Sequence, residues 1–364
     1  MIPGGAMDSA RFLREFWQQQ PLLIPAANEF TNPLEPEELA GLALEPGVEA
    51  RLVRQRGDDW HQDPGPLEDS SFAGDEPWTL LVQRVDHYVP EVAALRRWVD
   101  FLPGWRLDDI MVSYATDGGG VGPHYDNYDV FLVQGAGQRR WQLGQRCDNS
   151  SPLRDNPDLR ILEDFEESAS YLLNPGDILY VPPGLAHWGT SAGTGMTYSI
   201  GFRAPRLADM LSRWVDELLP AIDPEQLYSD PQPLGSGRPG ELTDAAVAAA
   251  REQLRSLLEQ DASSADWFGE LVTETAVEAV DDDSAPLPAR VVLDPAARLA
   301  WREDVAGLTV YANGLSIAVV ADSELLAALC RGDEVDADDS NSELLNTLWD
   351  MGCLLAADAS LSTK

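Results

Sequence analysis

Two histidines and one aspartate form the most informative pattern in the sequence. His124 and Asp126 stand one residue apart, and His187 follows Asp126 by sixty-one residues. If the first pair lies on a strand, both side chains point to the same face, because side chains alternate along a strand. Two imidazoles and one carboxylate form the facial triad of non-haem Fe(II) oxygenases, which leaves coordination positions open. The pattern therefore predicts an iron site.

Neither half of this pattern is decisive alone, because H-x-D is common by chance and His187 could be an ordinary buried histidine. Its setting adds weight: H-x-D follows Gly118-Gly-Gly120, and the second histidine follows Pro175-Gly-Asp177. The main rival is a cupin of isomerase or dioxygenase type, which usually binds metal with H-x-H, a nearby glutamate and a later histidine. The remaining histidines, His61 and His87, are expected to be structural or surface residues.

A possible anion-binding residue follows in the run Gln138-Arg-Arg-Trp141. We expect this run to be a strand of the same sheet, so that one of Arg139 and Arg140 points inward and the other outward. A buried guanidinium is costly without an anion. A dicarboxylate such as 2-oxoglutarate would supply one, because arginine binds carboxylates through two parallel hydrogen bonds. A structural salt bridge with one of the many acidic residues is the alternative.

The elements around these residues predict a barrel or jelly roll. Residues 11–100 read as a mixed helix and strand segment, and residues 107–203 as short strands separated by Gly and Pro turns. The expected strands are Asp109–Thr116, Tyr128–Gln134, Arg139–Leu143, Ser170–Leu173, Ile178–Val181 and Met196–Phe202.

The pattern becomes helical after Pro205. Apolar residues recur at helical spacing at Leu207, Leu211, Trp214 and Leu218. Two further helices are expected over Leu242–Gln260 and Trp267–Val280, with linkers at 220–240 and 281–288.

The last part of the chain predicts a small α+β module of winged-helix type. Strand-like Leu308–Tyr311 and Leu315–Val320 flank Asn313-Gly314, a favourable hairpin turn, and two short helices follow. Residues 281–364 hold 5 basic and 16 acidic residues, a net charge of −11. Such a module would repel phosphates, so we expect protein contact or dimer packing and no direct nucleic-acid binding.

The whole chain is strongly acidic, with 25 Lys and Arg against 62 Asp and Glu in 364 residues and a formal charge of −37. This charge argues against unaided wrapping of nucleic acid and against docking on anionic membranes. It would attract a basic protein, although an acidic proteome, as in salt-adapted organisms, would produce it as well.

The redox and targeting signals point to the cytoplasm. The chain has three scattered cysteines and no apolar run near the ~18–20 residues that span a bilayer. Its N-terminus lacks a signal-peptide pattern. We therefore expect a soluble, cytoplasmic protein without a disulfide framework.

As a set, these motifs resemble the Jumonji-C family of 2-oxoglutarate oxygenases and, more narrowly, its bacterial ribosomal oxygenases. The resemblance covers residues 10–205 by motif, and the later segments match in layout. Many other family members use Lys or Tyr in place of the arginine. The matching residues are Gly118-Gly-Gly-Val-Gly-Pro-His124, Asp126, Tyr128-Asp-Val-Phe131, Arg139-Arg-Trp141, Pro175-Gly-Asp177, His187 and Ser199-Ile-Gly-Phe-Arg-Ala-Pro205.

The resemblance implies a mainly β fold: a double-stranded β-helix, the jelly-roll or cupin-like Jumonji-C barrel. With an N-terminal mixed segment, this catalytic domain would span residues 1–205. A helical dimerisation segment over 206–282 would make a homodimer, and residues 283–364 would form an acidic winged-helix-like domain.

The resemblance also implies the ligand set. Fe(II) would be held by His124, Asp126 and His187, and the far carboxylate of 2-oxoglutarate by Arg139, with O2 as the other cosubstrate. Hydroxyl groups that could help to hold 2-oxoglutarate belong to Ser113, Thr197 and Ser199. Thr197 and Ser199 share one strand face, so parity cannot choose between them.

The implied reaction is hydroxylation of the β-carbon of an arginine in large-subunit ribosomal protein sixteen, a basic ribosomal protein. Carboxylates and aromatic faces suit a guanidinium, so Asp117, Tyr125 and Tyr128 are candidate substrate-binding residues. Asp117 could instead merely begin the glycine turn. The alternatives are a Jumonji-C oxygenase acting on a different residue, by Asn or His hydroxylation or by demethylation, and a non-catalytic cupin-like binding protein.

Overall fold

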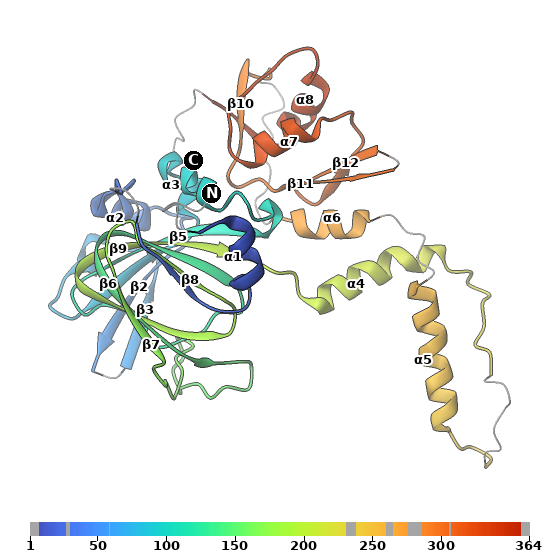
Figure 1. Cartoon of the computed structure of the whole chain (residues 1–364), viewed down its shortest axis with the longest axis horizontal. Helices are drawn as coiled ribbons and strands as arrows, with labels where there is room; N and C mark the ends of the chain where they lie inside the picture. Colours follow the sequence, from blue (N-terminus) through green and yellow to red (C-terminus); the bar gives the residue numbers. More distant parts are fainter. Residues whose placement is uncertain are drawn as a thin grey trace.

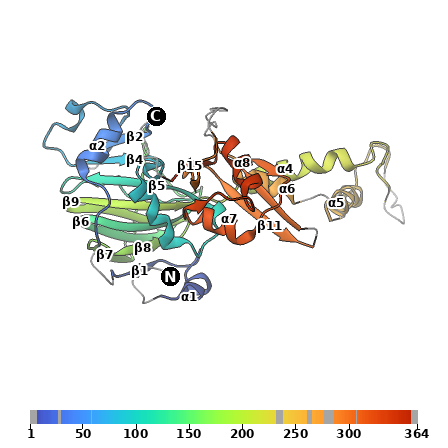
Figure 2. The same ribbon diagram turned by 90° about the horizontal axis from the view of Figure 1, so that it is seen from above.

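The computed structural model describes residues 7–26, 30–57, 59–230, 238–259, 265–275, 286–305 and 307–357. Figure 1 shows a β-barrel, a small C-terminal module beside it, and a helical arm that extends away from both. The view from above in Figure 2 shows the same arrangement, with α5 at the far end of the arm.

Within these ranges nine strands form one antiparallel sheet, in the order β1-β8-β6-β9-β5-β4-β2-β3, with β7 also paired to β6. This is the expected double-stranded β-helix. Its strands are β1 (Leu22–Ile24), β2 (Ala50–Arg56), β3 (Asp59–Pro64), β4 (Trp78–Val82), β5 (Leu107–Ala115), β6 (Asp129–Arg146), β7 (Ala169–Leu173), β8 (Ile178–Val181) and β9 (Leu185–Phe202).

Two long strands, β6 and β9, hold the barrel together. They pair from Asp129↔Phe202 to Arg146↔Leu185, with register shifts between Gln134 and Gln138. The expectation of two separate strands in this region was wrong, because the chain continues through these irregularities as one strand. β8 and β5 flank the first half of the long pair, and β7 flanks β6 in the second half.

Alternation along β6 separates two buried layers. Phe131 and Val133 pack into the large core under the N-terminal helices, while Val130 and Leu132 belong to a cluster on the opposite face of the sheet. Phe12 of α1 (Ser9–Glu15) is fully buried in the large core, edge-on to Tyr180. The other helical elements of this region are α2 (Pro36–Leu44), α3 (Pro90–Ala93) and short 3-10 turns at Asp69–Phe72, Val85–His87, Ala94–Val99 and Gly104–Arg106.

The C-terminal module has its own apolar core and two small sheets, β14-β10-β15 and β11-β12-β13. The expected hairpin at Asn313-Gly314 is present. The elements are β10 (Arg290–Leu293), β11 (Leu299–Asp304), β12 (Gly307–Ala312), β13 (Leu315–Ile317), α7 (Ser323–Cys330), β14 (Val335–Asp336), α8 (Ser342–Asp350) and β15 (Leu354–Ala356).

The helical arm contains α4 (Leu207–Leu218), a 3-10 turn (Leu219–Ala221) and α5 (Asp244–Glu259), followed by α6 (Asp266–Thr273). α5 buries none of its residues. The third expected helix is shorter than predicted, and its last residues, 276–280, lie outside the described residues. α6 packs on the C-terminal module, where Tyr311 donates a hydrogen bond to Asp266. No helix in the described ranges has the length and apolarity to cross a bilayer.

Candidate metal centre

A loop before β6, and not a strand, carries the first two candidate ligands. His124 forms an isolated antiparallel bridge with His187 of β9, and their main-chain N–H···O distances are 3.1 and 2.8 Å. The Gly184 N–H donates to the Asp126 carbonyl at 2.7 Å. His124 and Asp126 therefore do not lie on a regular strand, and their main-chain hydrogen bonds to His187 of β9 and to Gly184 just before it, rather than strand alternation, place them.

Gly122 explains why the chain turns here. Its φ of +80° lies in the left-handed region, which a side chain disfavours. A Cβ at this position would also lie 2.7 Å from Cδ1 of Ile161. Glycine thus permits the turn that delivers His124 to β9.

The side chains of the three residues converge. The His187 Nε2 lies 3.5 Å from the Asp126 Oδ2, and one potential ligand atom from each of His124, Asp126 and His187 lies within 4.8 Å of the others. Each histidine Nδ1 is 3.0 Å from a carbonyl two residues earlier, that of Gly122 or Leu185. An Nδ1–H donated to a carbonyl leaves Nε2 with its lone pair free for a metal ion.

The protonation state of His187 suits a ligand. Burial, together with the neighbouring His124, lowers its pKa to about 4, against the opposing influence of Asp126. Its imidazole is therefore neutral near pH 7, as metal binding requires.

Arg139 is the inward member of its pair, as alternation predicts, while Arg140 is exposed. The Arg139 guanidinium donates to Ser113 Oγ at 3.2 Å and to the Gly189 carbonyl at 3.4 Å, and its Nε–H has no partner. Burial alone lowers its pKa to about 10, so it remains charged. No carboxylate pairs with it in the described part of the chain, which excludes a structural salt bridge there.

The candidate hydroxyl groups differ in position. Ser113 contacts Arg139 and lines the pocket with Ser199. Thr197 is fully buried, donates to the Gln134 side chain at 3.2 Å, and is not among the residues that line the pocket. The geometry thus separates two residues that strand parity could not.

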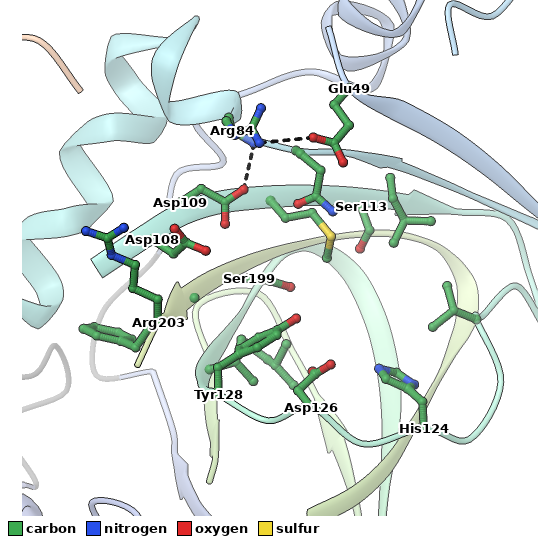
Figure 3. A pocket seen from close by; sticks show the side chains of 18 of the residues that line it. Glu49, Arg84, Asp108, Asp109, Ser113, His124, Asp126, Tyr128, Ser199 and Arg203 are labelled. Carbon is green, nitrogen blue, oxygen red and sulfur yellow. Dashed lines mark hydrogen bonds and ion pairs between the residues drawn. The ribbon is translucent and has the colours of Figure 1, made fainter. Parts of the chain in front are cut away.

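A pocket of about 980 Å³ contains the triad and Arg139. Figure 3 shows Asp109 and Ser113 along β5, Ser199 on the neighbouring strand, and His124 with Asp126 across the pocket. Asp109 was not among the residues expected at the site. Burial, helped by the nearby Asp86, raises its pKa to about 6, although its carboxylate accepts the Arg84 N–H at 3.0 Å.

The three residues expected to bind substrate are not equivalent in the structure. Tyr128 and Tyr125 line the pocket, whereas Asp117 accepts the Gly193 N–H at 2.7 Å and is not among the lining residues. Tyr125 donates its hydroxyl to the Asp148 carbonyl. Tyr128 is 43% exposed, and burial of its hydroxyl together with Asp126 raises its pKa, so that it stays protonated.

The donor set fits a divalent transition metal. Within the described ranges no other group of three His, Cys, Asp or Glu side chains lies close enough to share an ion. Two imidazoles and one carboxylate are the ligand types of a facial triad, and all three side chains line the pocket, where they would hold the ion. The orphaned Arg139 beside it fits the second carboxylate of a keto-diacid.

A barrel of this topology with this triad and buried arginine defines a JmjC-domain, 2-oxoglutarate-dependent oxygenase. The JmjC domain model matches residues 94–210, and the ROXA-like winged helix model matches residues 256–355. The chain is 39% identical over 268 residues to the ribosomal protein uL16 3-hydroxylase of Escherichia coli K12, covering 73% of this chain and 72% of that protein. It is a member of the ribosomal oxygenase family.

Two further comparisons agree. A probable ribosomal oxygenase of Haemophilus influenzae is 35% identical over 355 residues, which cover 89% of this chain and 86% of that protein. The structure of the Escherichia coli ribosomal oxygenase YcfD in complex with cobalt and 2-oxoglutarate superposes with a TM-score of 0.79 at 33% identity, over 96% of this chain and 98% of that one.

Proposed function

We propose that the protein is an Fe(II)- and 2-oxoglutarate-dependent hydroxylase of a basic large-subunit ribosomal protein, uL16, and that an arginine β-carbon is its target. One observation carries the proposal: Arg139 is buried, without an anionic partner among the described residues, in the same pocket as His124, Asp126 and His187. The name of the Escherichia coli relative supports the substrate.

Each side chain has a defined task in this proposal. His124 and His187 hold the iron through Nε2, and Asp126 holds it through its carboxylate. When bound, the ferrous ion and 2-oxoglutarate supply the oxidant for an unactivated C–H bond. Arg139, with the Ser113 hydroxyl, binds and orients the far carboxylate of the cosubstrate.

The other end of the pocket favours a cationic substrate side chain. Asp109 and Ser113 lie four residues apart on β5, which corresponds to ~13 Å along a strand. Asp109 is thus far enough from Arg139 to accept a guanidinium while the cosubstrate occupies the inner end. Tyr128 offers an aromatic face and a hydroxyl between them. Asp117 is less suited, since its carboxylate already caps the Gly193 N–H.

We also propose a homodimer, built by the helical segment within 206–282, with the catalytic domain at 1–205 and the winged-helix domain at 283–364. The support is an apolar surface on the arm that nothing in the described part of the chain covers: Leu207 is 81% and Leu211 52% exposed. Because its substrate would be a ribosomal protein, the enzyme would act in the cytoplasm.

The test is turnover by the full-length protein with Fe(II), 2-oxoglutarate and a peptide containing the arginine region of uL16. We expect peptide-stimulated succinate formation and one added oxygen on the arginine side chain, located by fragmentation mass spectrometry. His187→Ala should abolish both. An added oxygen on Asn or His, or the loss of a methyl group, would show that the target is not the arginine. No succinate at all would favour a non-catalytic binding protein.

A further inference from the structure

The C-terminal module reaches the outer end of the catalytic pocket. Pro295, Ala296 and Arg298, in the segment before β11, line the same pocket as Arg139 and His187. The proposed chemistry uses no residue of this module. Its presence at the pocket therefore requires a separate explanation.

Arg298 crosses from this segment to the first residues of β5. Its Nη1 donates to the Leu107 carbonyl at 2.8 Å, and its Nη2 donates to Asp108 Oδ1 at 2.8 Å. The Arg298 side chain is only 19% exposed, so solvent screens these bonds weakly. Its main chain is fixed in turn by Asn313, which accepts the Arg298 N–H at 2.9 Å and donates its own N–H to the Arg298 carbonyl at 3.0 Å.

β5 is irregular at the point where Arg298 binds it. Leu107 pairs with Phe202 and Ile110 with Ile200, so that Asp108 and Asp109 together oppose a single residue of β9. Two residues opposite one define a β-bulge, which leaves main-chain groups unpaired and changes the direction of side chains. Asp109 lies within this bulge and lines the pocket (Figure 3).

A second link ties the other end of the bulge to the same segment. The fully buried Asp86 accepts the Ile110 N–H at 2.9 Å and also pairs with Arg96, whose Nε lies 2.9 Å away. The Arg96 Nη2 donates to the Pro295 carbonyl at 2.8 Å. Both sides of Asp109 are thus connected to residues 295–298.

We propose that the winged-helix module contributes residues to the substrate site. Arg298 is a positioning residue that holds the β5 bulge so that Asp109 faces the pocket, and residues 295–298 form the outer wall against which a cationic segment of the protein substrate docks. The identity of that segment rests on the function proposed above. The hydrogen bonds by which Arg298 holds the β5 bulge, called the clamp below, do not depend on that function.

Hydrogen exchange of the full-length protein tests the clamp without any turnover. In Arg298→Ala, the amides of residues 108–111 should exchange about tenfold faster than in the wild type, because local opening becomes easier. Arg298→Lys, which keeps a charged donor, should give an intermediate rate. The matched control is Arg302→Ala, since Arg302 is exposed in β11 and its ion pair among the described residues is with Asp304 of the same strand. Equal exchange in Arg298→Ala and the wild type would overturn the inference.

Turnover tests whether the clamp serves substrate recognition. The probes are two otherwise identical peptides that carry arginine or its neutral isostere citrulline. The preference for arginine in kcat/KM should fall about five- to tenfold in Arg298→Ala, with the KM for 2-oxoglutarate unchanged, and should not change in Arg302→Ala. A retained preference would contradict the recognition role. A wild type that shows no preference would contradict the proposed substrate cation, while the exchange result still decides the clamp.

Discussion

His124 and His187 are joined through their main chains, by hydrogen bonds of 3.1 and 2.8 Å, and not through their imidazoles. The bridge leaves the two ring centroids 4.3 Å apart, and each Nδ1 is already occupied by a carbonyl. The geometry for a metal ion is therefore built by the backbone before any ion binds. Loss of one ring should remove the ion without disturbing the fold.

We accordingly expect His187→Ala to bind no stoichiometric Fe(II) or Co(II) and to keep its circular dichroism spectrum. The bridge to His124 survives, because it uses only the main chain of residue 187. Metal analysis after desalting gives the readout. The control is His61→Ala, because His61 is exposed and pairs only with Asp59 in the described structure. Full metal content in His187→Ala would show that the triad is not the binding site.

Arg139→Met should raise the KM for 2-oxoglutarate about a hundredfold, because a buried carboxylate would lose its ionic partner. Without cosubstrate the same variant should be at least as stable as the wild type, since it removes a buried charge that lacks an anion. Thermal unfolding with and without 2-oxoglutarate separates the two effects. Arg140→Met, on the exposed face of the same strand, should change neither.

Position 189 is expected to require glycine, because it packs against the arginine that would bind the cosubstrate. A Cβ at this position would lie 2.7 Å from Arg139 Nε and from two ring carbons of Trp141. Gly189→Ala should therefore displace the guanidinium and raise the KM for 2-oxoglutarate by about tenfold or more, with some loss of stability from overpacking. Gly41→Ala, in helix α2 with nothing within 4 Å, should be slightly stabilising instead. An unchanged KM in Gly189→Ala would contradict this requirement.

The residues of the metal site were predictable because their types and spacing form a recognisable pattern in the sequence. Only four histidines occur in the chain, and two of them begin an H-x-D pattern, His61 with Asp63 and His124 with Asp126. The glycine-rich run before His124 and the later His187 distinguish the second pattern from the first. Strand alternation predicted that one arginine of the pair is buried, but it could not choose between Arg139 and Arg140, and that choice came from the family resemblance. The backbone bridge that unites His124 with His187 could not be predicted, because it joins a loop to a strand sixty-three residues away.

Asp109 carried a signal that the sequence analysis did not use. Asp109, Met111 and Ser113 alternate on one strand face, so the choice of Ser113 already placed Asp109 in the pocket. The β5 bulge and its clamp by Arg298 leave no such trace, because they depend on contacts across nearly two hundred residues. The local periodicity of a sequence does not reveal contacts between segments that are so far apart in the chain.

A charge on the apolar surface of the helical arm should prevent the proposed dimerisation. Leu211→Asp is expected to convert the proposed homodimer to a monomer, because it would place a carboxylate in the proposed apolar interface. Sedimentation velocity measures the change. Leu315→Asp is the control, as Leu315 is similarly exposed but lies in β13 of the C-terminal module. A wild type that sediments as a monomer, or a Leu211→Asp variant that stays dimeric, would contradict this interface.

Asp109→Asn should lower kcat/KM for the arginine peptide and raise the free energy of unfolding. The neutral amide cannot pair with a guanidinium, so kcat/KM for the arginine peptide should fall by about tenfold or more. Succinate formation without peptide should not change, because Asp109 lies four residues along β5 from Ser113, the residue that contacts Arg139.

The stability gain of Asp109→Asn should depend on pH in a defined direction. Burial raises the pKa of Asp109 from an ordinary 3.8 to about 6, so the fold disfavours its ionised form. At pH 7 the carboxylate is ionised in both the folded and unfolded states, and the folded state carries the full penalty. Replacing it should add about 1–2 kcal/mol to the free energy of unfolding there.

Between pH 6 and 4 this gain should shrink, because the folded wild type takes up a proton before the unfolded chain does. Below about pH 3.8 both states are protonated and the gain should vanish. Urea unfolding at pH 7 and pH 4 measures the difference. Asp108→Asn, which removes a carboxylate that is half-exposed and paired with Arg298, should show no such gain at pH 7. An equal gain at both pH values would show that ionisation of Asp109 is not its source.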